Sequence, residues 1–310
     1  MKQVEERYIS LLTDFGFKRI FGTAMNKDLL ICFLNSLFNG RQVVKDVSYL
    51  NPEHVGDVYT DRKAIFDVYC EGENGEKFIV EMQNAYQAYF KDRSLFYSTF
   101  PIREQAPKGS DWGFKLNHVY TVALLNFNMN EDAFDKEKIR HHVQLCDTAT
   151  HKIFYDKLEF IYVEIAKFNK TLGELDTLYE KWLYALKNLY KLTQRPKELC
   201  DKVFDRLFEE AEIAKFTPQE MREYEASKMA YRDIKNSIDT AKQEGLAEGM
   251  EKGMEKGMEL GMEKGMKKGM AKGMNQKALD IARNMLADGV DINLIMKYSG
   301  LTQEQIEKLK

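Results

Sequence analysis

The sequence predicts an α/β fold, in which a mixed sheet flanked by helices is followed by an all-helical C-terminal region. Three observations favour this fold. Residues 1–170 hold helical patterns, apolar runs of strand length, a crossing helix and further strands, in the order typical of an α/β layer structure. Residues 171–243 carry helical patterns alone. A four-residue glycine repeat over 244–275 precedes a short helical tail, 276–310, so we expect four regions.

The first region begins with two helices and a short strand. Apolar residues at helical spacing predict a helix over 11–21 with Gly22 as its stop. A second helix is expected over 28–38, ended by Asn39-Gly40. Residues 43–50 have the pattern of a strand.

The remaining elements of the first region include its most apolar strands. Residues 64–70 and 77–83 form an expected β-hairpin. A helix is expected over 86–105. The runs 118–127 and 160–165 are apolar enough to predict buried strands.

The composition of the 310-residue chain limits its class. It has 46 Lys and Arg, 49 Asp and Glu, a formal charge of −3 and 44% apolar residues. The many aromatic residues, with 19 Phe and 16 Tyr, exclude wholesale disorder. The near-neutral charge argues against coating nucleic acid by bulk charge, although a local basic cleft stays open. No apolar run reaches the ~20 residues of a membrane span, and the N-terminus lacks a signal-peptide pattern. Four scattered cysteines favour a cytoplasmic location over a disulfide framework.

Two carboxylates, Asp67 and Glu81, lie inside the apolar strands of the expected hairpin. Lone carboxylates are rarely buried there, because desolvating a charge costs several kcal/mol unless something compensates. Glu81 and Gln83 share one face of their strand, because side chains alternate. The length of the turn decides whether the Asp67 side chain lies on the same face of the sheet as Glu81 and Gln83.

Two turns suit the sequence, so the register of the hairpin stays open. A two-residue turn at Asn74-Gly75 would pair Asp67 with Met82 and put the acids on opposite faces, whereas a three-residue loop would pair Asp67 with Glu81. In the second register the carboxylates would lie about 5 Å apart, a repulsion that Mg²⁺ or another divalent cation would remove. That arrangement predicts metal-assisted phosphodiester hydrolysis. The alternative is that one acid faces solvent on a half-exposed sheet.

The wider sequence resembles a known family at several points in the same order. These points are TDFGFKRIFG at 13–22, FLN at 33–35, Asp67, VEMQ at 80–83, FKDR at 90–93, Tyr97 and Gln105. Over about residues 10–130 the chain resembles the Rpn family of recombination-promoting nucleases, also described as PD-(D/E)XK nuclease family transposases. The resemblance implies a restriction-endonuclease-like fold for the core, residues 1–170, and Mg²⁺-dependent DNA endonuclease activity linked to recombination.

The family's motif implies a catalytic set of Asp67, Glu81 and Gln83. Asp67 and Glu81 would ligate the metal, with the Met82 carbonyl as a further ligand. Gln83 stands where the general motif has lysine, and it offers only a neutral donor near the attacking water and the phosphate. Asp14, in the first helix, is a third candidate metal ligand, because nuclease cores of this type often bring an acid from that helix to the metal. The alternative is that Asp14 only starts the helix or lies on the surface.

Candidate DNA contacts follow in the next helix. Arg93 and Tyr97 are four residues apart and share a helix face, where Arg93 would contact a phosphate or pair with a carboxylate. Gln105 completes this set by resemblance. The spacing of one further group matches no closed zinc site: His141, His142, Cys146 and His151.

A glycine repeat runs from Gly245 to Gly273, and the last seven of its eight glycines are each followed by Met. Each glycine costs a helix about 1 kcal/mol relative to alanine, and Lys–Glu pairs return only a few tenths. An isolated helix over 244–275 should therefore be unstable. Packing against a second copy would offset the cost, so we expect a homo-oligomerisation segment or, alternatively, a flexible spacer.

The tail is expected to form three short helices. Gly289 ends the first, Asp291 caps the second, and Thr302 with Gln305 makes a capping box for the third. The turn at 299–301 resembles that of a helix-turn-helix, but the short last helix favours a packing cap.

Two functions follow from these patterns. The leading one is a cytoplasmic, Mg²⁺-dependent DNA endonuclease without a membrane anchor. The alternative is a catalytically weak or inactive relative that acts as a DNA-binding or oligomeric interaction protein, which the neutral Gln83 and the neutral net charge keep open.

Overall fold

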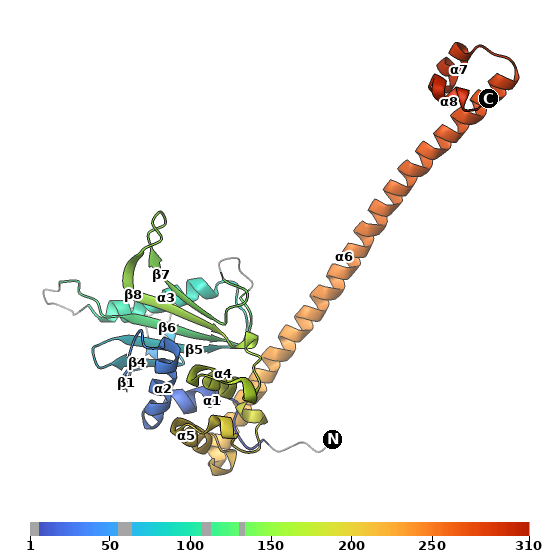
Figure 1. Cartoon of the computed structure of the whole chain (residues 1–310). Helices are drawn as coiled ribbons and strands as arrows, with labels where there is room; N and C mark the ends of the chain where they lie inside the picture. Colours follow the sequence, from blue (N-terminus) through green and yellow to red (C-terminus); the bar gives the residue numbers. More distant parts are fainter. Residues whose placement is uncertain (1–5, 55–63, 107–112, 130–133, 310) are drawn as a thin grey trace. The chain divides into compact units, whose positions relative to one another are not determined.

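The computed structural model describes residues 6–54, 64–106, 113–129 and 134–309 (Figure 1). The chain divides into two compact units, Met1–Ile238 and Asp239–Lys310. Each unit is described by itself below.

The first unit is built around a six-stranded mixed sheet with the order β1-β4-β5-β6-β8-β7 (Figure 1). The central strands β5, β6 and β8 run parallel, and the pairs β1–β4, β4–β5 and β7–β8 are antiparallel. Two short strands, β2 and β3, form a separate pair. The strands are β1 (Val47–Tyr49), β2 (Glu53–His54), β3 (Ala64–Ile65), β4 (Val68–Gly72), β5 (Lys77–Gln83), β6 (Val119–Leu125), β7 (Arg140–Cys146) and β8 (Ile153–Glu164).

Helices cover both faces of this sheet. On one face, α1, α2, α4 and α5 share one hydrophobic core with Val80, Val122 and Val163 of the sheet. Figure 1 shows these helices on the same side of the sheet. On the other face, Phe90 at the start of α3 packs against β6 and β8. The helices are α1 (Asp14–Phe21), α2 (Lys27–Phe38), α3 (Phe90–Glu104), α4 (Leu178–Asn188), α5 (Lys202–Glu210), α6 (Pro218–Ala287), α7 (Ile292–Ser299) and α8 (Gln303–Glu307). Short 3₁₀ helices are η1 (Ala24–Asn26), η2 (Ile165–Lys167), η3 (Leu172–Glu174), η4 (Leu189–Lys191), η5 (Lys197–Leu199) and η6 (Ile213–Lys215).

This architecture confirms the predicted α/β class with its helical C-terminal region. The helices that follow residue 170 share a core with the sheet, because Trp182, Phe204 and Tyr224 are fully buried in the same cluster as Val80. Because this core includes residues on both sides of position 170, the predicted domain boundary there stays a prediction. None of the helices in the described ranges has the length and apolar character that a membrane span needs.

Several elements differ in extent from their predictions. The helix α1 starts at Asp14 because Thr13 caps it, its side chain accepting the Gly16 N–H. The helix α3 starts at Phe90, four residues later than predicted. The strand β7 and the outer half of β8 were not predicted, because most of their side chains there are exposed or half-buried and give no apolar run.

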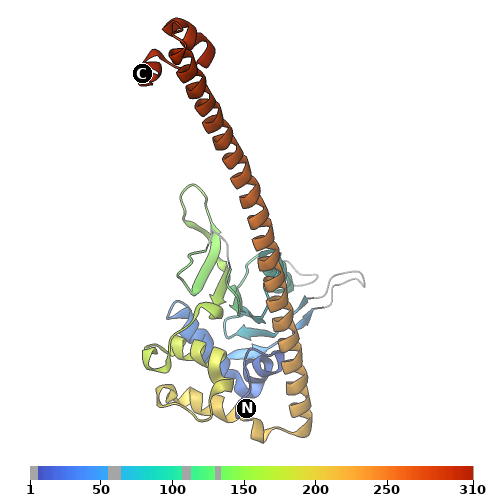
Figure 2. The ribbon, with the colours of Figure 1, turned by 90° about the vertical axis from the view of Figure 1, so that its right-hand side faces the viewer.

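The second unit contains most of α6 together with α7 and α8. Figure 2 shows α6 as one uninterrupted helix, which includes the whole glycine repeat. The methionines of the repeat are 68–77% exposed. In the tail, Asp291 and Thr302 cap α7 and α8 as predicted, and Gly289 and Gly300 have positive φ. A small core of four buried residues joins these helices: Ala282, Ile295, Leu301 and Ile306.

Candidate active site

The turn between β4 and β5 adopts the three-residue alternative. The Gly72 N–H donates to the Glu76 carbonyl over 2.8 Å, which leaves 73–75 as the loop. Gly75 ends this loop with φ +80°. In this left-handed region glycine is favoured because it has no Cβ.

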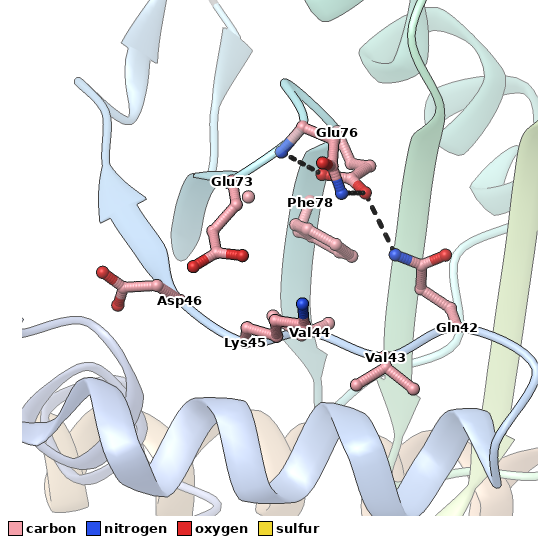
Figure 3. A pocket seen from close by; sticks show the side chains of 10 residues that line it. Gln42, Val43, Val44, Lys45, Asp46, Glu73, Glu76 and Phe78 are labelled. Atoms are coloured by element: carbon pink, nitrogen blue, oxygen red, sulfur yellow. Dashed lines mark hydrogen bonds between the residues drawn. The ribbon is translucent and has the colours of Figure 1, made fainter.

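A buried carboxylate fixes this turn (Figure 3). Glu76 accepts hydrogen bonds from the Asn74 N–H (3.1 Å), from Asn74 Nδ2 (3.0 Å) and from Gln42 Nε2 (3.1 Å). Burial alone would raise the pKa of Glu76, but the hydrogen bonds outweigh it and hold the pKa below its usual value. The ionised Glu76 therefore stabilises the three-residue loop.

We expect Gly75→Ala to lower the free energy of unfolding by about 1–3 kcal/mol. A Cβ at this position would need positive φ and would lie 2.4 Å from Asn117 Nδ2. Urea unfolding measures the effect. The matched control is Gly173→Ala, where a Cβ meets no atom within 4 Å. Equal stability of the two variants would contradict a strained turn at Gly75.

The three-residue loop brings the two acids opposite each other. The observed register pairs Val68 with Val80, so the next pair along the strands is Asp67 with Glu81. Asp67 lies in the bend before β4, and its Oδ2 accepts the Met82 N–H over 2.8 Å. Of the two registers open to the sequence, the structure has the one that brings the carboxylates together.

The Glu81 carboxylate is unevenly satisfied. Its side chain is 7% exposed. Its Oε2 accepts hydrogen bonds from Gln83 Nε2 at 3.0 Å and from Arg93 Nη2 at 3.2 Å. Its Oε1 is buried and finds no hydrogen-bond partner among the described residues. A buried oxygen without a partner is costly, so this atom is suited to an added ligand.

Their surroundings raise the pKa of both acids. Burial first, and then the charge of Asp67, raise the pKa of Glu81 to about 7, against the opposing effects of Arg93 and Gln83. Burial also raises the pKa of Asp67, although the Met82 N–H and the charge of Lys18 oppose it. With a pKa of about 7, Glu81 is poised near neutral pH to exchange a proton for a cation.

Helix α1 brings a lysine and a further acid beside this pair. Lys18 Nζ lies 2.7 Å from Asp14 Oδ1 and 3.9 Å from Asp67 Oδ1. The Asp14 side chain is 64% exposed. Sequence reasoning missed Lys18, although it is four residues after Asp14 on the same helix face and belongs to the stretch 13–22 that carries the resemblance.

Helix α3 brings Arg93 to the other side of Glu81. The Arg93 guanidinium lies 5.2 Å from the centre of the Tyr97 ring and 5.9 Å from that of Phe90, and its Nη1 donates to Gln87 Oε1 over 2.8 Å. Arg93 and Tyr97 therefore share a face, as predicted. In this structure Arg93 pairs with a carboxylate, which is one of the two roles considered for it.

Gln105 is placed differently from the other candidate DNA contacts. It is the C-cap of α3, its Nε2 donates to the Pro101 carbonyl over 3.2 Å, and its Oε1 accepts the Asn117 N–H over 2.6 Å. None of the hydrogen bonds described for Gln105 reaches the carboxylates. Its DNA-binding role stays a prediction.

The histidine and cysteine group does not form a metal site in the part of the chain that the structure describes. His141 Nε2 lies 3.0 Å from Oε1 of the buried Glu164, whose Oε2 is 2.9 Å from Lys167 Nζ. His142 instead contacts Glu159. Across the described ranges, no three His, Cys, Asp or Glu side chains are placed to hold one ion, so Asp14 does not complete a triad with Asp67 and Glu81.

The two carboxylates nevertheless fit a small divalent cation. Mg²⁺ is typically bound by one or two carboxylates, with waters and substrate phosphate oxygens as its other ligands. Asp67 and Glu81 supply two carboxylates from facing segments, and Glu81 Oε1 is without a partner among the described residues. A third protein carboxylate is not required by this coordination.

Comparison with known families gives two matches. Residues 11–241 match the family described as PD-(D/E)XK nuclease family transposase. Residues 275–310 match the family described as Rpn/YhgA-like nuclease family, C-terminal HTH domain. No curated protein and no solved structure gives a match. The second match favours the helix-turn-helix interpretation of the tail over the packing cap that its short last helix suggested.

Proposed function

Because the chain belongs to the PD-(D/E)XK nuclease family transposases, we propose that it is a DNA endonuclease that uses Mg²⁺ or another divalent cation and acts in recombination. The observation that carries the proposal is the pairing of Asp67 with Glu81, with Glu81 Oε1 left without a partner among the described residues. Hydrolysis adds one water across a P–O ester bond: the water oxygen bonds to phosphorus, and the ester oxygen leaves and takes up a proton.

The proposed roles follow the contacts of the site. Asp67 and Glu81 hold the cation, with the Met82 carbonyl as a further ligand. A bound divalent cation supplies Lewis acidity and stabilises the charge that develops on the phosphoryl oxygens. Gln83, whose amide already donates to Glu81, orients this carboxylate and offers a neutral donor to the attacking water. Asp14 takes part by holding Lys18 beside Asp67.

DNA is the proposed partner of both units. Arg93, Tyr97 and Gln105 are the proposed contacts on α3, and the helix-turn-helix match supports DNA binding by residues 275–310. Phosphate contacts of this kind fix the position of a protein on DNA and weaken with added salt. The four cysteines are free, which supports a cytoplasmic location as part of the proposal.

A second candidate is a catalytically weak relative that binds DNA without cutting it well. Two observations favour it: Gln83 carries no charge, and Arg93 already pairs with the proposed ligand Glu81. In this case the protein would bind a DNA duplex, and the rate of cleavage would stay near background.

Nicking of supercoiled plasmid tests the proposed function. We expect the wild type to nick the plasmid with Mg²⁺ and not with chelator, and Asp67→Ala to lose about 100-fold or more, since even residues that only support metal ligands contribute 10–100-fold. The matched control is Asp46→Ala, a half-exposed acid paired with Lys27 over 2.6 Å. Equal nicking by wild type and Asp67→Ala would reject the enzyme. Duplex binding without nicking would favour the second candidate.

A further inference from the structure

The proposed site lacks the charge that lysine gives the general motif, because position 83 holds glutamine. Gln83 Nε2 donates to Glu81 Oε2 over 3.0 Å and cannot neutralise a phosphate. Two cations from other elements lie at the carboxylates: Arg93 from α3, 3.2 Å from Glu81, and Lys18 from α1, 3.9 Å from Asp67. Either could supply the missing charge.

Arg93 is held in place by several contacts at once. It pairs with Glu81, donates to Gln87 Oε1 over 2.8 Å and lies over the rings of Tyr97 and Phe90. Its Nη1 and Nη2 already serve Gln87 and Glu81, so a contact with DNA phosphate would use the remaining donors of the guanidinium. Arg93 is therefore suited to orient the Glu81 carboxylate.

Lys18 combines a fixed backbone with a partly exposed side chain. Its neighbour Phe17 is fully buried, and α1 packs so closely at Gly16 that a Cβ there would lie 2.1 Å from the Ser10 carbonyl oxygen. The Lys18 side chain itself is 41% exposed. Among the described residues its nearest partner is the exposed Asp14, at 2.7 Å, and such surface ion pairs contribute at most about 1 kcal/mol. The amine can therefore exchange Asp14 for another anion at little cost.

We propose that Lys18 is a catalytic residue: its amine, delivered from α1, contacts a non-bridging oxygen of the scissile phosphate and replaces the charge that the motif lysine provides. The inference rests on the proposed function. Lys18 Nζ lies beside Asp67, and the amine carries three donors, so it can serve a phosphate oxygen while keeping Asp14. Its role is electrostatic, and no bond to Lys18 forms or breaks.

Single-turnover cleavage at saturating DNA tests this role. We expect Lys18→Ala to slow cleavage by about 10²–10³-fold, the loss typical for one donor to a developing oxyanion. Lys18→Arg should keep part of the rate. The double variant Lys18→Ala/Gln83→Lys, which returns the charge to the motif position, should recover part of what Lys18→Ala loses. The matched control is Lys27→Ala, whose side chain is 45% exposed and pairs with Asp46, and its rate should not change.

Binding of a DNA duplex with Ca²⁺ in place of Mg²⁺ gives a second readout. Lys18→Ala should reduce the slope of log Kd against log salt by about 0.9, the value for one lost phosphate contact, while Lys27→Ala leaves the slope unchanged. A thermal unfolding curve shows whether each variant is folded. The role of Lys18 is rejected if Lys18→Ala is folded and has the cleavage rate and salt slope of the wild type. If Asp67→Ala is inactive in the same assays, the proposed nuclease function is still supported. If Asp67→Ala also cleaves normally, or if the wild type binds no DNA, both proposals fail.

Discussion

Glu81→Gln is expected to abolish cleavage and, in the metal-free protein above pH 7, to raise stability. Burial and the nearby Asp67 raise the folded-state pKa of Glu81 from 4.5 to about 7. The folded state therefore holds a proton that the unfolded state releases at lower pH. Ionisation of Glu81 therefore lowers the free energy of unfolding as the pH rises. This loss is absent below pH 4.5, grows up to about pH 7 and reaches about 3 kcal/mol above it. A neutral glutamine does not carry this cost.

Urea unfolding with chelator at pH 5 and pH 8 measures this effect. The wild type should lose stability between the two values, and Glu81→Gln should lose less. The matched control is Glu76→Gln, another buried glutamate of the same hairpin, whose pKa is lowered by its hydrogen bonds and whose replacement should destabilise the protein at pH 8. Added Mg²⁺ should stabilise the wild type at pH 8 and leave Glu81→Gln unchanged. A Glu81→Gln variant less stable than the wild type at pH 8 would contradict a strained carboxylate.

We propose that the glycine repeat, residues 244–275, associates with the same segment of a second copy of the chain. Within α6 the seven methionines that follow glycines are 68–77% exposed, and a Cβ added at any glycine of the repeat meets no atom within 4 Å. Eight glycines cost a helix about 8 kcal/mol relative to alanine. The two ion pairs in the repeat, Lys252–Glu248 and Lys267–Glu263, return about 0.3–0.5 kcal/mol each. We therefore expect packing against a second copy to stabilise this helix.

Replacing the seven Gly-Met glycines by alanine in the full chain separates association from helix formation. Alanine favours the helix by about 7 kcal/mol in total but prevents close approach of two backbones. We expect the wild type to form oligomers and to lose helical content on dilution. The alanine variant should stay helical and associate more weakly. Sedimentation equilibrium and circular dichroism measure the two effects. A wild type that is monomeric at all concentrations would reject self-association.

The predicted and observed structures agree best where a strand is buried on both faces. All seven residues of β6 and five of the seven of β5 are buried, and their apolar runs are visible in the sequence. The register of the hairpin could not be predicted in the same way, because both turns have acceptable local chemistry. The hydrogen bond from Gln42 to Glu76 supports the observed turn, and it joins residues 34 positions apart.

The positions of Lys18 and Arg93 in the site could not be predicted from the sequence either, because they depend on contacts between residues far apart in the chain. Asp67 and Glu81 could be named from one hairpin, since their spacing along the chain already implies that they can meet. Lys18 reaches Asp67 only because α1 packs against the sheet, and nothing in the local pattern around either residue predicts that contact. The role of Arg93 depended in the same way on whether α3 carries it to a carboxylate or to solvent.

The length of the 73–75 loop has an evolutionary consequence. In a strand, a shift of one residue turns every side chain to the opposite face. Loss or gain of a single codon in this loop would therefore separate Asp67 from Glu81 and leave most of the apolar strand sequence intact. A lineage could silence such a nuclease in one genetic step, and a compensating codon in the same loop could restore it.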